Sequence, residues 1–167
     1  MQDRKRKPSV SKAKPKTKKK KIEKRITSIW KDIGGKEGDQ LGPDGELSKL
    51  ANECFEIDAG KYTYEACVFG GAKQREGKTG GTNLGSWTGM DIDEESGRRV
   101  MRWERGAKCW NGPERSATVF LSCGLETKLI SADEPDTCRY VFEMESYIAC
   151  DEAYKERNGI EEPVVVE

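Results

Sequence analysis

Four polar side chains in the cysteine-containing part of the chain supply the donors and acceptors that a pyranose sugar needs: Gln74, Arg115, Glu134 and Tyr140. Vicinal sugar hydroxyls both donate and accept hydrogen bonds. A site for them combines a guanidinium that only donates, a carboxylate that only accepts, an amide that does both and a phenol. These residue types predict a sugar-binding site. By composition alone, ordinary surface charge is the better explanation of Arg115 and Glu134, so the prediction needs independent support.

The chain of 167 residues contains no histidine, and this excludes several kinds of active site. A Ser-His-Asp triad, a Cys-His pair, a His-ligated metal and a histidine pH switch are impossible. The acidic cluster Asp91, Asp93, Glu94 and Glu95 adjoins a glycine-rich turn, where a solvated loop is the better explanation than a hydrolase pair. We therefore expect no catalytic residues there, no metal and no cofactor.

Charge divides the chain into two opposite parts. Residues 1–25 carry 13 Lys or Arg and two acidic residues, whereas the remainder carries 17 basic and 28 acidic residues. The basic segment resembles a nuclear-localisation or nucleic-acid patch, but a solvated linker is the better explanation. It lacks interleaved aromatic residues, so we expect no specific nucleic-acid binding. No apolar run approaches the roughly 20 residues that cross a bilayer, so we expect no membrane partner. The N-terminus also has no apolar stretch that could serve as a signal peptide.

The six cysteines lie in the acidic part, at positions 54, 67, 109, 123, 138 and 150. An even number within a short segment predicts a disulfide framework and an oxidising compartment, although 15 pairings are open from sequence alone. A zinc site is disfavoured because there is no Cys-x-x-Cys and no histidine. Disulfides would also explain how a chain with only 34% hydrophobic residues holds a fold.

Composition predicts four zones. Residues 1–21 are basic and almost without apolar residues, so we expect them to be disordered. Residues 22–46 contain isoleucines at helical spacing, which predicts a short helix ending at Gly34-Gly35, the end of a coiled coil, followed by a turn at residues 42–45. Residues 47–152 form the predicted domain, and residues 153–167 a C-terminal tail.

The predicted domain is all-β. Aromatic and β-branched residues are enriched in five segments: residues 62–69, 99–103, 117–123, 127–130 and 138–144. Glycine-rich stretches between them, including residues 77–85, predict turns. Residues 71–79 resemble a phosphate-binding loop with one residue too many, so we interpret them as a flexible loop. Short strands without intervening helices predict an antiparallel barrel or sandwich.

Several segments resemble the mannose 6-phosphate receptor homology (MRH) domain, and in particular that of the β subunits of endoplasmic-reticulum glucosidase II. The resemblance covers about 105 residues and all six cysteines. It is carried by residues 54–69 with Gln74, and by residues 83–87, 106–116, 121–124 and 134–140; the Gly-Pro-Asp-Gly-Glu turn at residues 42–46 is also similar. It implies a flattened β-barrel with disulfides Cys54–Cys67, Cys109–Cys138 and Cys123–Cys150.

The resemblance also implies roles for the four polar residues, which we call the quartet. Arg115 would donate on the side of the mannose 2-hydroxyl, which Gln74 would share. Glu134 would accept from the 3- and 4-hydroxyls, and Tyr140 would hold that side of the ring. Trp110 and Tyr62 are similar to auxiliary sugar contacts of the family; core packing is the alternative, and is equally good for Tyr62.

The function implied by the resemblance is that of a non-catalytic lectin subunit in the lumen of the endoplasmic reticulum. It would bind terminal mannose of high-mannose N-glycans and assist a separate catalytic α subunit that removes glucose. The family's cysteine-rich N-terminal region and a retrieval signal are missing, which indicates a fragment and weakens the expectation of an α-subunit partner. The alternatives are another MRH lectin, in glycoprotein degradation or as a phosphotransferase accessory subunit, and a nuclear protein acting through the basic tail.

Overall fold

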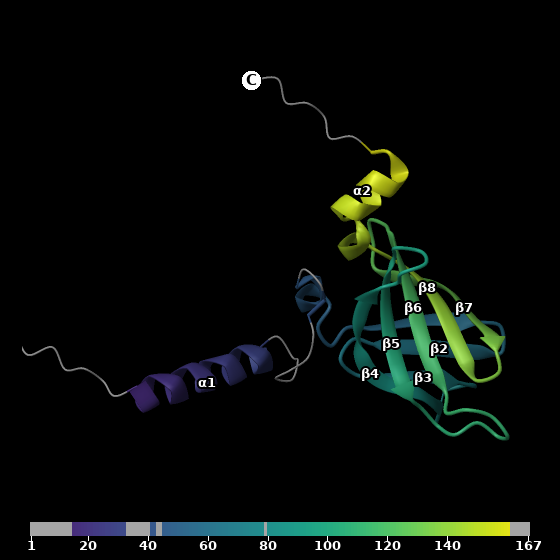
Figure 1. Cartoon of the computed structure of the whole chain (residues 1–167). Coiled ribbons are helices and arrows are strands. Elements are labelled where there is room, and N and C mark those ends of the chain that lie inside the picture. The colour runs from purple at the N-terminus through teal and green to yellow at the C-terminus, as the bar shows by residue number, and fades with distance from the viewer. Residues whose placement is uncertain (1–14, 33–40, 43–44, 79, 161–167) are drawn as a thin grey trace, which may run out of the picture. The chain divides into compact units, whose positions relative to one another are not determined.

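The computed structural model describes residues 15–32, 41–42, 45–78 and 80–160. These residues belong to two separate compact units. One contains the helix α1 (Pro15–Asp32), and the other contains all the remaining described elements (Figure 1). We call the second unit the barrel.

Helix α1 begins earlier than the sequence indicated. It includes residues 15–21, which we predicted to be disordered, and that prediction is wrong for these residues. Lysine is a good helix former, proline is favoured at the first helical position, and Lys19 forms an i,i+4 ion pair with Glu23 at 4.0 Å. Residues 1–14 and the predicted helix stop at Gly34-Gly35 lie outside the described residues.

The barrel is a single eight-stranded sheet in the order β1-β2-β3-β4-β5-β6-β8-β7, and its two end strands lie near each other. Figure 1 shows β5, β6, β8 and β7 side by side, with β2 and β3 crossing behind them, so the barrel is flattened. This confirms the predicted all-β fold. The strands are β1 (Cys54–Ala59), β2 (Tyr62–Cys67), β3 (Gly71–Arg75), β4 (Thr82–Ile92), β5 (Arg99–Arg105), β6 (Ser116–Cys123), β7 (Lys128–Asp136) and β8 (Arg139–Ser146).

One strand pair departs from the antiparallel expectation. Strands β6 and β8 pair in parallel, with Ala117 opposite Tyr140, whereas the neighbouring pairs are antiparallel. The short connection after β6 leads to β7 at the end of the sheet. The β7–β8 hairpin then returns β8 to the gap between β7 and β6, where it runs in the direction of β6.

The core follows from alternation along the strands. In β6, Ala117, Val119 and Leu121 are buried while the residues between them are partly exposed, as a strand with one face inside a barrel requires. Trp103 and Phe142 are fully buried. The Trp103 indole N–H donates to the carbonyl oxygen of Cys67 at 3.1 Å, so burial leaves this donor satisfied.

Glycine content misled the prediction between residues 70 and 85. Strand β3 occupies much of the predicted flexible loop at residues 71–79, and β4 begins within the predicted turn at residues 77–85. Gly85 is needed for packing, because a Cβ there would lie 2.6 Å from the backbone carbon of Trp103 on β5. Strand β1 was not among the predicted strands.

The structure contains the three disulfides Cys54–Cys67, Cys109–Cys138 and Cys123–Cys150, the same pairs that the MRH resemblance implies. The first joins the paired strands β1 and β2. The second joins the loop before β6 to the turn before β8, and the third joins the end of β6 to the residue after the 3-10 helix η2 (Tyr147–Ala149). Each therefore fixes a contact between segments that the chain alone would leave free.

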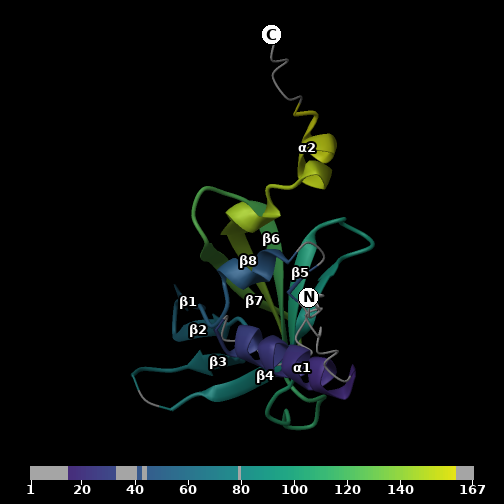
Figure 2. The ribbon, with the colours of Figure 1, turned by 90° about the vertical axis from the view of Figure 1, so that its left-hand side faces the viewer.

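A buried arginine joins the segments that precede and follow the barrel strands. The Arg99 Nε donates to Glu46 Oε1 at 2.5 Å, and the same guanidinium pairs with Asp151. Glu46 begins the 3-10 helix η1 (Glu46–Lys49), and Asp151 caps helix α2 (Glu152–Asn158) by accepting from the Tyr154 amide at 2.7 Å. Helix α2 lies at one end of the barrel in Figure 2. It includes residues 153–158, which we predicted to be the first part of a C-terminal tail.

Candidate functional site

Gln74 lies within β3. From the sequence we instead expected it in the loop that follows a strand. It is opposite Tyr64 of β2 and Thr82 of β4. The Gln74 Nε2 donates to the Tyr64 hydroxyl at 3.0 Å, which leaves the amide oxygen of Gln74 as an acceptor and fixes the plane of the amide. A register shift next to it, between Ala72 and Lys73, is the kind of irregularity that redirects a side chain near a site.

Arg115 is the last residue before β6, and carbonyl oxygens hold its side chain. Its Nη1 donates to the carbonyl oxygens of Ala107 and Lys108, at 3.3 and 3.1 Å. Its backbone pairs with Gly106 and Ala107, and Gly106 is required there because a Cβ would lie 2.7 Å from the Arg115 oxygen. The Arg115 Nε is buried and has no partner. A buried donor without a partner is unusual in folded proteins.

Glu134 lies near the end of β7 and reaches back to the following turn. Its Oε1 accepts a hydrogen bond from the backbone amide of Cys138 at 2.6 Å. Cys138 has a positive φ of 64°, which places the turn in the left-handed region. The Cys109–Cys138 disulfide ties this turn to the loop that precedes Arg115. One disulfide therefore brings together the two segments that carry Arg115 and Glu134.

Tyr140 of β8 lies at the centre of the quartet and is only 3% exposed. Burial raises the pKa of its phenol above the ordinary value, and the charge of Glu134 acts in the same direction. A hydrogen bond from Arg115 and the charge of that guanidinium oppose the shift. Tyr140 is therefore within electrostatic reach of both Arg115 and Glu134, and it remains a neutral hydroxyl at physiological pH.

Tyr64 connects Gln74 to Tyr140, and it was not among the site residues predicted from the sequence. Its ring centroid lies 6.1 Å from that of Tyr140, and its hydroxyl accepts from Gln74. A chain of contacts thus runs from Gln74 through Tyr64 to Tyr140, and from there to Arg115 and Glu134. The alternation of Tyr64 with Ala66 and Val68 marked it as inward-facing, but that pattern is equally typical of any core aromatic residue.

The two auxiliary candidates differ. Trp110, in the loop closed by the Cys109–Cys138 disulfide, is 92% exposed, so core packing does not explain it. Tyr62 is partly buried, packs against the core and lies edge-on to Tyr64 at 6.3 Å. The core-packing alternative therefore applies to Tyr62, although part of its ring stays accessible.

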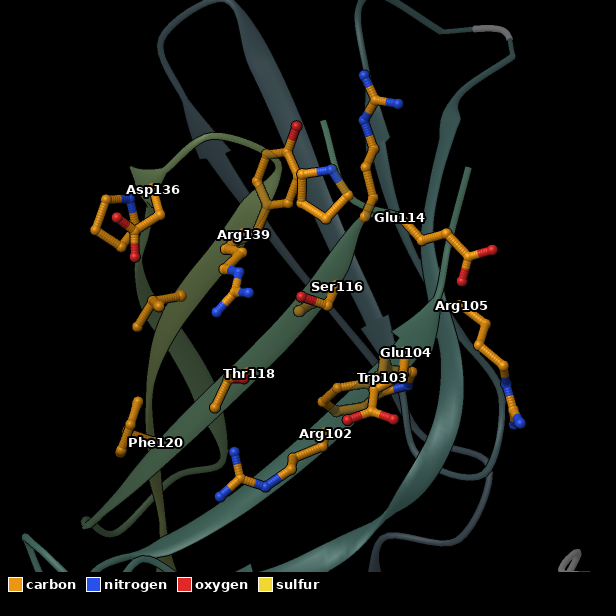
Figure 3. Close-up of a pocket in the computed structure, with 16 residues that line it drawn as sticks. Arg102, Trp103, Glu104, Arg105, Glu114, Ser116, Thr118, Phe120, Asp136 and Arg139 are labelled. Carbon is orange, nitrogen blue, oxygen red and sulfur yellow. The ribbon is translucent and has the colours of Figure 1, made fainter. Parts of the chain in front are cut away.

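A groove of about 640 Å³ lies beside the quartet, on β5, β6 and β8 (Figure 3). The guanidinium groups of Arg102 and Arg139 lie on either side of Thr118 in this view. Arg115 and Tyr140 contribute to its lining, but Gln74 and Glu134 do not. The groove therefore borders the quartet without containing it.

The chemistry of the quartet suits hydrogen bonding to a neutral polyol. It offers one guanidinium, one carboxylate, one amide and one neutral phenol, each oriented by the contacts above. Among the described residues, no group of three or more acidic, cysteine or histidine side chains gathers as metal ligands. No helix in the part of the chain that the structure describes is long and apolar enough to cross a membrane.

Comparison with curated proteins links the chain to one set of relatives. It is 42% identical over 117 residues to glucosidase 2 subunit beta of Homo sapiens, which covers 67% of this chain and 21% of that protein. It is 40% identical over 132 residues to glucosidase 2 subunit beta of Oryza sativa subsp. indica, with 79% and 20% covered. The chain thus spans about a fifth of the length of these relatives.

Comparison with solved structures agrees with this relationship. The crystal structure of the MRH domain of glucosidase II beta bound to mannose superposes with a TM-score of 0.51 at 29% identity, covering 62% of this chain and 98% of that one. The barrel therefore has the MRH fold. The family model for glucosidase II beta subunit-like proteins matches residues 10–165. The chain belongs to the glucosidase II beta subunit-like protein family.

Proposed function

We propose that this chain is a non-catalytic lectin that binds terminal mannose of high-mannose N-glycans through Gln74, Arg115, Glu134 and Tyr140. In this role it would help a separate catalytic α subunit of glucosidase II to remove glucose during glycoprotein processing. Family membership and the mannose-bound MRH relative support the lectin part of the proposal. The subunit name of the curated relatives supports the partnership with an α subunit. The three disulfides support a place in an oxidising compartment such as the lumen of the endoplasmic reticulum.

The observation that carries the proposal is that the Cys109–Cys138 disulfide ties the loop before Arg115 to the turn between Glu134 and Tyr140, where Glu134 Oε1 accepts from the Cys138 amide at 2.6 Å. A neutral phenol beside a donor-only and an acceptor-only group can bind adjacent hydroxyls of one ring face. In the proposed complex Arg115 and Gln74 share the 2-hydroxyl, and Glu134 accepts from the 3- and 4-hydroxyls.

The proposed site is expected to bind a single glycan weakly. Sugar hydroxyls already bond well to water, so each protein hydrogen bond adds only about 0.5 to 1.5 kcal/mol. Attachment to an enzyme that acts on the same glycan compensates, because it raises the effective concentration of the glycan at the lectin site. The exposure of Trp110 supports its proposed role as a contact to a second sugar, which would extend the site beyond one mannose.

The proposal is tested by measuring glycan binding to the oxidised full chain, using high-mannose glycans with and without terminal α1,2-linked mannose. We expect mannose-dependent binding that Arg115→Lys weakens at least about tenfold, because lysine keeps the charge but lacks the fork of donors. Arg139→Lys is the matched control, since Arg139 begins β8 next to Tyr140 but is exposed and outside the quartet.

The outcomes of this experiment separate the candidates. Absence of binding by a folded, fully disulfide-bonded wild-type chain would overturn the lectin proposal. Equal losses for Arg115→Lys and Arg139→Lys would contradict the assignment to the quartet and favour the neighbouring groove instead. Binding without any stimulation of a glucosidase II α subunit would retain the lectin and remove the proposed partnership.

A further inference from the structure

Helix α1 is strongly positively charged. Its 18 residues include eight Lys or Arg and only two acidic residues. Helix α1 belongs to a compact unit separate from the barrel. The charge therefore calls for an explanation outside the sugar site.

The same helix presents an exposed apolar stripe, formed by Ile22, Ile26, Ile29 and Trp30. The spacing of four, three and one residues places all four on one face of a helix. Ile26 is 40% exposed and Ile29 is 51% exposed, and Ile22 is exposed as well. The lysines at positions 20, 21 and 24 lie on the remaining surface. A helix with one apolar and one cationic face suits a boundary between an apolar and an anionic phase.

We propose that α1 binds the surface of membranes that contain anionic phospholipids. The helix lies in the interface, with the apolar stripe directed toward the acyl chains. Its lysines and arginine contact the phosphate and carboxylate groups of the lipid heads. Charge complementarity provides the long-range attraction, and the stripe provides a contact that high salt does not screen.

A second copy of α1 is a poorer binding partner for the apolar stripe than a membrane interface is. Continuing the pattern upstream with alternating steps of three and four residues reaches Lys19 and Pro15, so a coiled-coil seam is not apolar beyond Ile22. Two such helices would also bring like charges together, which destabilises the pair. This argues against the predicted coiled-coil end as a dimerisation element.

Nucleic acid and the acidic barrel of another copy would each bind the cationic face of α1 but leave its apolar stripe without a partner. Phosphates would attract the lysines, but they offer nothing to three exposed isoleucines. The groove of about 640 Å³ is lined by four arginines, which would repel the lysines of α1. The cavity of about 530 Å³ is acidic, but Ile92 is the one apolar residue in its lining. A membrane interface supplies both kinds of contact.

The expectation of no membrane partner rested on the absence of a segment that could span a bilayer. That finding stands for the described helices, and it does not bear on a helix that lies in the interface. The proposed contact is peripheral, so it depends on lipid charge and ionic strength, which a spanning helix would not.

The test is sedimentation of the full chain with vesicles of phosphatidylcholine alone or mixed with phosphatidylserine. We expect binding only to the mixed vesicles, and weakening as salt is raised. The double variant Ile26→Asn/Ile29→Asn should lower the partition coefficient at least about tenfold, because it removes two apolar side chains from the interface. Lys20→Gln/Lys24→Gln should lower it at least about fivefold.

The matched control is Ile92→Asn/Ile130→Asn, which makes the same change at barrel isoleucines that are 44% and 45% exposed. We expect this variant to bind mixed vesicles as the wild type does. Failure of the wild type to bind, or equal losses in the two isoleucine variants, would overturn the proposal. Two further results would overturn it in the absence of vesicle binding. These are binding of single-stranded RNA, or self-association, that is abolished in the stripe variant Ile26→Asn/Ile29→Asn. Glycan binding is unchanged in the stripe variant, so this result is independent of the proposed lectin function.

Discussion

Tyr140 contributes to the candidate site through a single hydroxyl group. Its ring packs in the core beside Tyr64, at 6.1 Å between centroids, so the fold needs the ring and the proposed sugar site needs the oxygen. Arg115 shows a similar division, because two carbonyl oxygens occupy its Nη1 and leave its Nε without a partner. At this scale, substitutions can separate binding from stability.

Tyr140→Phe should weaken mannose binding at least about tenfold while changing the free energy of unfolding by less than about 1.5 kcal/mol, since the ring and its packing remain. Glycan binding measured by calorimetry, together with urea unfolding, checks this. Tyr147→Phe serves as the control because it removes a phenol oxygen from an exposed residue of η2, outside the quartet. A Tyr140→Phe chain that binds glycans as the wild type does would contradict the role of this hydroxyl.

The raised pKa of Tyr140 predicts how stability depends on pH. The folded state holds the phenol proton more tightly than the unfolded state, whose tyrosines titrate near pH 10. The contribution is therefore fully present below about pH 10 and is lost as pH rises through the pKa of the folded state. Urea unfolding of wild type and Tyr140→Phe should diverge only above about pH 10, with the wild type losing more stability. Parallel curves throughout would refute the assignment.

At the scale of elements, the site depends on connections between segments distant in sequence. The Cys109–Cys138 disulfide joins the loop that presents Arg115 to the turn that presents Glu134 and Tyr140. Away from the site, buried Arg99 at the start of β5 pairs with Glu46 of η1 and with Asp151, the cap of α2. This ion pair network closes the end of the barrel.

Arg99→Ala should destabilise the barrel by about 3 kcal/mol or more, because it leaves two partly buried carboxylates without their cation. Thermal or urea unfolding of the oxidised chain measures the effect. Lys61→Ala is the contrasting control, since Lys61 pairs with Glu76 in an exposed ion pair, and solvent screening makes such pairs contribute little to stability. A loss no larger than that of Lys61→Ala would show that the network is dispensable.

At the scale of the whole molecule, the chain combines two units with different charges and different proposed ligands. The barrel depends on disulfides because its core is small for the number of residues that it orders, whereas α1 contains no cysteine. The two proposed activities should therefore respond differently to reduction.

Reduction of all three disulfides should abolish glycan binding and leave binding to phosphatidylserine-containing vesicles largely unchanged. The physical reason is that each disulfide contributes about 2 to 4 kcal/mol to the barrel, and α1 needs only local contacts and the membrane surface. Parallel glycan-binding and sedimentation measurements on oxidised and reduced chain check this. Simultaneous loss of both activities would mean that the helix acts only together with the folded barrel.

The sequence by itself determined the all-β class, because enrichment in aromatic and β-branched residues along segments such as residues 117–123 and 138–144 is a local property of strands. It also excluded histidine chemistry and supplied the residue types of the quartet. Local pattern was insufficient where glycines serve packing, as at Gly85, and where lysines continue a helix, as at residues 15–21.

Only the tertiary structure decided which of these residues meet. Gln74 lies in strand β3 and Arg115 lies in the loop before β6. Tyr64 and Tyr140 lie between them and connect them. The parallel pairing of β6 with β8, the Cys109–Cys138 link and the Arg99 network likewise join segments far apart in the chain. Periodicity records which face a residue occupies, but contacts between distant segments depend on how the whole sheet closes, and that is settled only when the barrel packs.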